Sequence, residues 1–151
     1  MSEKNPIRIF VTHAFVGDAD YHRVFEYLES SPNFFYKNTS DPDRAPAGGG
    51  REALKDELRA QIKEAEVVVA LASLYETNEL WATYQMDAAQ AMDVPIIAIG
   101  FFGRDDKLPD IIKKRAATVV LWNERELIDA VRRIARHEQT NRWEVIEFTL
   151  D

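Results

Sequence analysis

Short runs of apolar residues alternate along this chain with stretches in which apolar residues recur at helical spacing. Segments 7–15, 66–73 and 94–101 are rich in β-branched and aliphatic residues, and we expect each to contain a strand. Two of them, 66–73 and 94–101, are apolar almost throughout, which is typical of strands covered on both faces. Shorter apolar segments predict two further strands, over 33–41 and 118–122.

The segments between these strands carry apolar residues every three or four positions, as amphipathic helices do. The first has Asp18 as its expected N-cap, and the second places Leu54, Leu58 and Ile62 along one buried stripe. Segment 141–151 is ambiguous, since it reads either as an added edge strand or as a tail that packs on a partner. The predicted helices cover 18–30, 51–65, 77–92, 107–116 and 123–137.

Strand and helix alternate five times without an internal repeat or a linker, so we expect one α/β domain over residues 1–151. Five such strands predict a parallel sheet in a flavodoxin-like three-layer sandwich, with strand order 2-1-3-4-5. Ligands of these sheets bind at the carboxyl ends of the strands, where the strand order reverses. That edge gathers segments 12–17, 40–50 and 73–85 around one expected crevice.

Composition narrows the function classes. The 151 residues carry a formal net charge of −7, which disfavours non-specific binding to nucleic acid or to an anionic membrane. The chain has no cysteine, which excludes disulfides and thiolate catalysis. The N-terminal segment lacks the apolar core of a signal peptide, and no apolar run approaches the ~20 residues that span a bilayer. The three histidines show no metal-ligand spacing, and we expect a cytoplasmic protein without a bound metal or cofactor.

Three features of the expected crevice could carry chemistry. The loop from Thr12 to Phe15 offers hydrogen-bonding groups and a stacking ring, but its sequence is not diagnostic and an ordinary loop is favoured. Three glycines at 48–50 resemble a phosphate cradle, yet no GxGxxG or GxxxxGK[ST] motif is present, which favours a surface loop. Gln85 shares a helical face with Trp81, and it is either a buried amide with partners or a polar lining of the crevice.

Three stretches of the chain resemble Toll/interleukin-receptor (TIR) domains: IRIFVTHAF with DYHRVFEYL, then IKEAEVVVALASLYETNELWATYQMDAA, then VPIIAIGFFG. The resemblance covers nearly the whole chain and is closest to the compact bacterial branch that includes the TIR subunit of the Thoeris anti-phage system. It implies an enzyme that cleaves the nicotinamide–ribose bond of NAD+. In that branch, NAD+ is the substrate, no cofactor is needed, and the product is an ADP-ribose-derived messenger that activates a separate effector.

The most specific family element, a Trp-x-x-x-Glu motif, departs from the family at its last position, where Trp81 is followed four residues later by Gln85. A carboxylate there stabilises positive charge on the ribose and can accept a proton, and an amide does neither. Losing one such group costs on the order of 10²–10³ in rate. We therefore expect this chain to bind NAD+ but turn it over poorly, and Gln85→Glu to restore turnover. Two histories stay open: an engineered replacement, which the isosteric change favours, and a natural non-catalytic paralogue.

The resemblance also implies roles for other positions. Gln85 stands at the position of the catalytic carboxylate, with Trp81 and Tyr84 as its support in the motif. The loop 44–50 corresponds loosely to the loop through which TIR domains assemble. The residues expected to line the NAD+ site are Thr12, His13, Ala14, Phe15, Ser40, Asp41, Ser73 and Tyr75.

The main alternative is a non-catalytic TIR scaffold or sensor that self-assembles or binds a partner, through loop 44–50 or the tail RWEVIEFTLD. On the enzyme hypothesis the partners are NAD+, further copies in a homo-oligomer or filament, an effector reached through a diffusible nucleotide, and a phage-derived trigger. A receiver-like phosphoacceptor is set aside, because Thr12–His13 and Ala72–Ser73 stand where that chemistry needs acidic residues. We do not expect a neighbouring acid to replace a carboxylate at position 85, the candidates being Glu76, Glu79 and Asp87.

Overall fold

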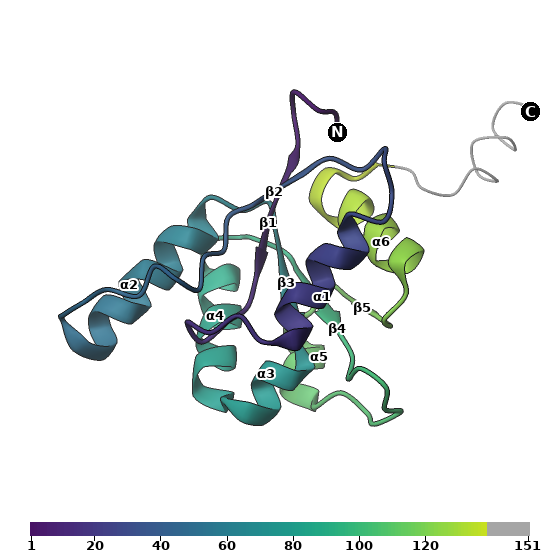
Figure 1. Ribbon diagram of the computed structural model, residues 1–151. Coiled ribbons are helices and arrows are strands. Elements are labelled where there is room, and N and C mark those ends of the chain that lie inside the picture. The colour runs from purple at the N-terminus through teal and green to yellow at the C-terminus, as the bar shows by residue number, and fades with distance from the viewer. Residues whose placement is uncertain (139–151) are drawn as a thin grey trace, which may run out of the picture.

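A computed structural model describes residues 1–138 of the protein (Figure 1). The segment expected to form an edge strand or a tail, 141–151, lies outside these residues. Within the described range, every helix is too short or too polar to cross a lipid bilayer. The elements, in chain order, are β1 (Ile7–Val11), α1 (Ala19–Leu28), β2 (Tyr36–Asn38), α2 (Gly50–Lys63), β3 (Val67–Leu71), α3 (Ala72–Thr77), α4 (Glu79–Ala91), β4 (Ile96–Ile99), α5 (Asp110–Arg115), β5 (Thr118–Val120) and α6 (Glu124–Arg136).

The five strands form one parallel sheet in the order β2-β1-β3-β4-β5, which confirms the predicted flavodoxin-like topology. In this sheet β1 pairs with β2 on one side and with β3 on the other, so that Ile9 aligns with both Asn38 and Val67. The direction in which the chain adds strands reverses between β1 and β3. The loops after β1 and β2 and the helices after β3 therefore leave the sheet at neighbouring points of its carboxyl edge.

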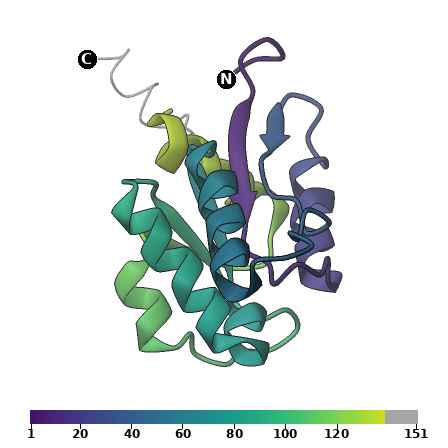
Figure 2. The same ribbon diagram turned by 90° about the vertical axis from the view of Figure 1, so that its left-hand side faces the viewer.

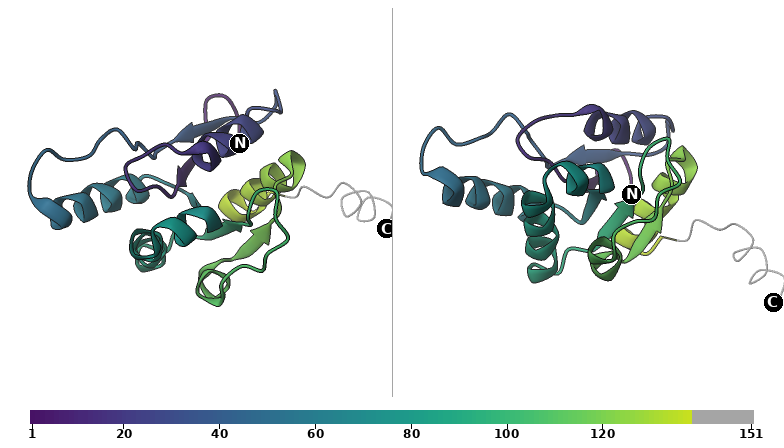
Figure 3. Two further views of the ribbon diagram at one scale, coloured as in Figure 1. Left: turned by 60° about the horizontal axis from the view of Figure 1, so that its bottom comes forward. Right: turned by 90° about the horizontal axis from the view of Figure 1, so that it is seen from below.

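Each face of the sheet has its own hydrophobic core, because successive strand residues point to opposite faces. Val67 and Val69 lie in the core that α1 and α6 cover, whereas Val68 and Ala70 lie in the core that α2, α4 and α5 cover. Figure 3 shows these two helical layers on opposite sides of the strands. The continuous apolar runs of β3 and β4 are thus explained by burial on both faces.

The segment after β3 differs from the sequence-based expectation. The apolar run predicted a strand as far as residue 73, but β3 ends at Leu71 and α3 begins at the next residue. Helix α4 then starts after Asn78, whose side chain accepts a hydrogen bond from the backbone N–H of Trp81 at 3.4 Å. Ala72 and Leu74 are buried in α3, so apolar burial continues past the end of the strand and hides the boundary from a hydrophobicity pattern.

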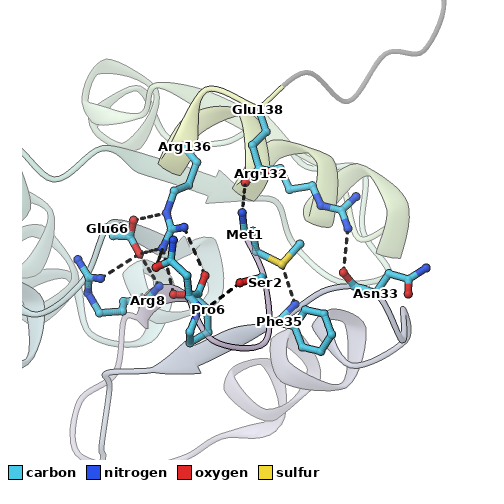
Figure 4. Close-up of polar contacts among 11 residues, drawn as sticks. Met1, Ser2, Pro6, Arg8, Asn33, Phe35, Glu66, Arg132, Arg136 and Glu138 are labelled. Atoms are coloured by element: carbon cyan, nitrogen blue, oxygen red, sulfur yellow. Dashed lines mark hydrogen bonds and ion pairs between the residues drawn. The ribbon is translucent and has the colours of Figure 1, made fainter.

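The amino edge of the sheet is closed by an ion pair between α6 and the start of β3 (Figure 4). Arg136 donates to Glu66 through Nε at 2.5 Å and through Nη2 at 2.8 Å, and its Nη2 also donates to the carbonyl of Pro6 at 3.1 Å. Glu66 accepts a further hydrogen bond from the backbone N–H of Arg8 at 2.9 Å. Burial by itself would raise the pKa of Glu66, but the hydrogen bonds and charges of the two arginines lower it. The end of α6 is thereby fixed against β1 and β3.

Candidate functional site

Gln85 is a buried amide that joins α4 to the loop after β1. Its side chain has no exposed surface. Its Oε1 accepts a hydrogen bond from the backbone N–H of His13 at 2.9 Å, and its Nε2 donates to the carbonyl oxygen of the same residue at 2.8 Å. The second hydrogen of Nε2 goes to the carbonyl of Trp81, also at 2.8 Å. Both amide hydrogens are therefore used, and the side chain points at backbone rather than at open space.

The ring of His13 continues this network toward α2. Its Nδ1 accepts a hydrogen bond from the backbone N–H of Phe15 at 3.0 Å, so the ring proton lies on Nε2. Nε2 lies 2.9 Å from Oε1 of Gln61, to which it donates. The imidazole is packed at the same time among the rings of Phe10, Phe15 and Tyr21, with centroid distances between 5.1 and 6.2 Å.

Gln61 on α2 repeats the pairing that Gln85 makes. Its Oε1 accepts from the backbone N–H of Asp41 at 2.9 Å, and its Nε2 donates to the carbonyl of Asp41 at 3.1 Å. Nε2 also donates to the carboxylate of Glu57 at 2.9 Å. Gln85 on α4 thus holds the loop after β1, and Gln61 on α2 holds the loop after β2. The His13 ring, which lies in the first of these loops, links it to Gln61.

The environment of His13 favours its neutral form. Burial is the largest effect and lowers the pKa of the imidazole below its ordinary value of 6.5. The hydrogen bond with Gln61 and the negative charges of Asp41 and Glu57 act in the opposite direction but do not outweigh burial. A neutral ring with Nδ1 as acceptor is also what the contact with the Phe15 N–H requires.

A second polar cluster lies beside this network, under the loop after β2. The hydroxyl of Tyr21 lies 2.9 Å from Oγ of Ser40 and accepts a hydrogen bond from Nδ2 of Asn38 at 3.1 Å. These three residues border an open groove of about 440 Å³ at the carboxyl edge of β2. The groove is lined by Gly17, Tyr21, His22, Phe25, Asn38, Ser40, Asp41, Pro42 and Asp43.

The structure brings together only part of the set that the sequence suggested. His13 and Asp41 are linked through Gln61, and Ser40 and Asp41 line the groove. Thr12 is buried and serves the sheet instead, since its Oγ1 accepts a hydrogen bond from the backbone N–H of Leu71 at 3.1 Å. Ala14 and Phe15 are half-buried, and Phe15 has a left-handed backbone with φ of 61°.

The remaining residues of the expected NAD+ site lie on helices. Ser73 and Tyr75 belong to α3 rather than to a loop at the rim. The Tyr75 hydroxyl donates to Glu79 at 3.1 Å, and the buried Oγ of Ser73 has no hydrogen-bond partner within residues 1–138. Neither side chain forms a hydrogen bond with the Gln85–His13 network.

Trp81 and Tyr84 face a different surface from Gln85. Their side chains are half-buried and line a groove between α2 and α4, on the outer side of those helices. In its hydrogen bond with Gln85, Trp81 accepts through its backbone carbonyl. The motif therefore divides between an interior position, 85, and two positions on the surface.

The acids nearest to position 85 in the sequence form polar contacts with other residues. Glu76 forms a two-bond ion pair with Arg104, at 3.0 Å for each bond. Asp87 pairs with Arg115 at 2.7 Å. Glu79 accepts the hydrogen bond from Tyr75. The acids that do lie close to the buried network are Asp41 and Glu57, next to His13.

Comparison with known families identifies the family of the chain. Residues 10–106 match the family described as Thoeris protein ThsB, TIR-like domain. The chain belongs to this family. The match runs from the end of β1 to the loop after β4, and this range includes His13, Gln61 and Gln85. No curated protein sequence matches the chain.

Sequence reasoning missed Gln61, although a signal for it was present. Gln61 directly precedes Ile62 on the apolar stripe of α2, and it is 4% exposed. A neutral amide on the buried face of an otherwise charged helix poses the same question as Gln85, because a buried amide needs hydrogen-bond partners. Applied to both helices, that criterion would have found both ends of the network in this ThsB-family domain.

Proposed function

We propose that this chain is a Thoeris-type TIR-like domain of anti-phage defence in which NAD+ cleavage is strongly impaired. It acts by binding a nucleotide, a protein or further copies of itself. The observation that carries the proposal is the pairing of Gln85 with His13. The position of the family's catalytic carboxylate holds a neutral amide whose hydrogens are both committed to backbone carbonyls. Nothing of this side chain is exposed to a substrate.

The chemistry explains the impairment. Breaking the nicotinamide–ribose bond develops positive charge on the ribose, which a carboxylate stabilises and an amide does not. An amide at position 85 also cannot accept a proton from a ribose hydroxyl or an incoming nucleophile. The expected loss in rate is on the order of 10²–10³ relative to a carboxylate in the same place.

The local geometry also changes our expectation for the reverse substitution, Gln85→Glu. A carboxylate would keep the bond from the His13 N–H but would set oxygen lone pairs against the carbonyls of His13 and Trp81, which the amide meets at 2.8 Å. A buried charge in that position is costly, so the introduced glutamate would take up a proton and its pKa would rise. We therefore expect Gln85→Glu alone to leave NAD+ cleavage low, in contrast to the sequence-based prediction.

A second candidate function is an active enzyme that converts NAD+ into an ADP-ribose-derived signal for a separate effector. The observation that favours it is Asp41, an acid that lies close to His13 and lines the open groove at the carboxyl edge. A carboxylate beside a groove could stabilise the ribose cation in place of a residue at position 85. In that case the catalytic acid has moved from α4 to the loop after β2.

NAD+ consumption and product formation by the wild-type chain, Gln85→Glu and Asp41→Asn, followed by chromatography, test both candidates. Each protein is assayed dilute and under crowding, since assembly can complete a TIR site, and the exposed Asp105→Asn serves as the control for Asp41→Asn. We expect low consumption by all four. Turnover by Gln85→Glu alone would show a catalytic site that lacks only its carboxylate. Turnover by the wild type that Asp41→Asn abolishes would establish the second candidate.

Calorimetry of NAD+ binding to the wild-type chain then defines the kind of binding. Heat of binding without turnover indicates a nucleotide sensor. Absence of binding indicates a scaffold that recognises a protein or further copies of itself.

A further inference from the structure

The groove between α2 and α4 is an open feature of the described surface that the proposed function does not use. It encloses about 460 Å³ and runs along the outer side of the two helices, which lie side by side in Figure 2. At its edge Leu80 is 75% exposed. The lining residues are Arg51, Lys55, Asn78, Leu80, Trp81, Thr83, Tyr84 and Asp87.

The floor of the groove is aromatic and held in place. The rings of Trp81 and Tyr84 pack edge to face, with centroids 6.0 Å apart and an interplanar angle of 89°. The Tyr84 hydroxyl accepts a hydrogen bond from Arg59 at 2.8 Å and donates to the carbonyl of Lys55 at 3.3 Å. Such a preformed aromatic surface suits aliphatic or aromatic side chains.

One wall of the groove carries three cations, in a protein whose net charge is −7. Arg51, Lys55 and Arg59 follow one another at four-residue spacing, so they form one stripe along α2. Lys55 and Arg59 also pair with Glu52 and Asp56 on the solvent side of the same helix. The only acid in the lining, Asp87, is neutralised by Arg115 at 2.7 Å. The groove therefore matches an acidic segment that also carries large apolar side chains.

The chain itself contains such a segment. Residues 139–151 read QTNRWEVIEFTLD, with three acids against one arginine. Trp143, Val145, Ile146, Phe148 and Leu150 supply the apolar side chains, and Glu144 and Glu147 stand among them. The charge and the apolar character of this segment complement those of the groove.

The α2/α4 groove lies within reach of segment 139–151. Arg136, at the end of α6, is hydrogen-bonded to Glu66, which follows the last residue of α2 by three positions. From Lys63 back to Lys55 the helix rises roughly 12 Å, at 1.5 Å per residue. Thirteen residues extend up to roughly 40 Å, so segment 139–151 can pass around the amino edge of the sheet and follow α2 to the groove.

We propose that segment 139–151 docks in the α2/α4 groove of its own chain. Its apolar side chains cover Trp81, Tyr84 and Leu80, and its glutamates lie along the positive stripe of α2. Docking covers Trp81 and Tyr84, the surface residues of the motif. Release of the segment would expose these two residues to another partner. The proposal is independent of whether the domain cleaves NAD+.

Zero-length carboxyl–amine crosslinking of the full chain, followed by mass spectrometry, tests the contact. We expect Lys55 to link to Glu144 or Glu147, while Lys113 and Lys114 on α5 give no link to the segment. The link from Lys55 to Glu52, whose atoms lie 3.6 Å apart, is the internal positive control. An equal mixture of isotopically light and heavy chains should give no mixed pair. Mixed pairs would mean a second copy's segment, and a Lys55 that links only to Glu52 would overturn the proposal.

Indole N–H signals in an NMR spectrum of the full chain give a second, independent test. In the variant Glu144→Lys/Glu147→Lys we expect the Trp81 signal to shift. The Trp122 signal should stay, because its Nε1 donates to the carbonyl of Gly100 at 2.7 Å on another part of the sheet. The reversed pair Arg51→Glu/Lys55→Glu should shift Trp81 as well, and combining the four changes should move it back toward the wild-type position. The proposal would also be overturned if the Trp81 signal shifted in neither charge-reversal variant while an unchanged Trp122 signal showed that the fold is intact.

Discussion

The side-chain amide of Gln85 and the backbone of His13 form a complementary pair in which each supplies one donor and one acceptor, at 2.9 and 2.8 Å. Gln61 makes the same pair with the backbone of Asp41, at 2.9 and 3.1 Å. An amide side chain meets both the N–H and the C=O of one residue, whereas an ionised carboxylate has no hydrogen to donate. The two glutamines thus hold the two loops at the carboxyl edge of the sheet against α4 and α2.

This pairing predicts a stability cost for Gln85→Glu. The introduced carboxylate would face two carbonyl oxygens without water, and we expect the free energy of unfolding at pH 7 to fall by roughly 1–3 kcal/mol. Because folding raises the pKa of that glutamate, the charge is the unfavourable form, and the cost should be smaller at pH 4 than at pH 7. Urea unfolding at both pH values measures it. Gln90→Glu, at an exposed position of the same helix, is the matched control and should change little. An equal cost for both variants would contradict the structural role of Gln85.

His13 predicts a loss of stability on mild acidification. Its pKa is lowered in the folded protein, chiefly by burial, so the folded state binds fewer protons than the unfolded chain just below pH 6.5. The free energy of unfolding contributed by this residue is complete above that pH and declines as the pH falls toward the folded pKa. Urea unfolding between pH 7 and pH 5 should show the decline in the wild type and a flatter profile in His13→Gln. Identical pH profiles would argue against a buried neutral imidazole.

The ion pair at the amino edge predicts the effect of Glu66→Gln. Removing a carboxylate that accepts hydrogen bonds from Arg136 and Arg8 should cost about 1–2 kcal/mol at pH 7, less than for a fully buried pair because water screens part of the charge. The pKa of Glu66 is lowered on folding, so this contribution is present above the unfolded value of about 4.3 and is lost as the pH falls through the folded pKa. Thermal unfolding at pH 7 and pH 3 measures both points. Glu64→Gln, exposed and two residues away, should show neither effect.

The glycines before α2 predict a contrast between neighbours. Gly49 precedes α2 with φ of 87°, and a Cβ there would lie 2.7 Å from the Cβ of Ala53. Gly49→Ala should therefore lower the free energy of unfolding by at least about 1 kcal/mol. A Cβ at Gly48 would meet no atom within 4 Å, and Gly48→Ala should be neutral to within about 0.5 kcal/mol. Comparable losses for both would show that the glycines serve something other than backbone geometry.

Much of the fold could be read from apolar spacing, with errors where burial continued across a boundary. The five strands, the N-cap at Asp18 and the order of the sheet agree with the prediction. Helix α3 was missed, because Ala72 and Leu74 extend the apolar run of β3 into the helix that follows. Of the candidate site residues, His13, Asp41 and Gln85 proved to belong to one linked network. Thr12, Ser73 and Tyr75 make their contacts outside it.

The sequence by itself determined the layered parallel sheet and the helix that carries Gln85. Both follow from local periodicity, which repeats every two residues in a strand and every 3.6 in a helix and therefore survives in the linear pattern. Only the tertiary structure decided what Gln85 does there. Its partner, His13, is 72 residues away, and the partner of that ring, Gln61, is 48 residues from it. Such hydrogen bonds depend on how two loops return to one edge of the sheet, and no local periodicity encodes that path.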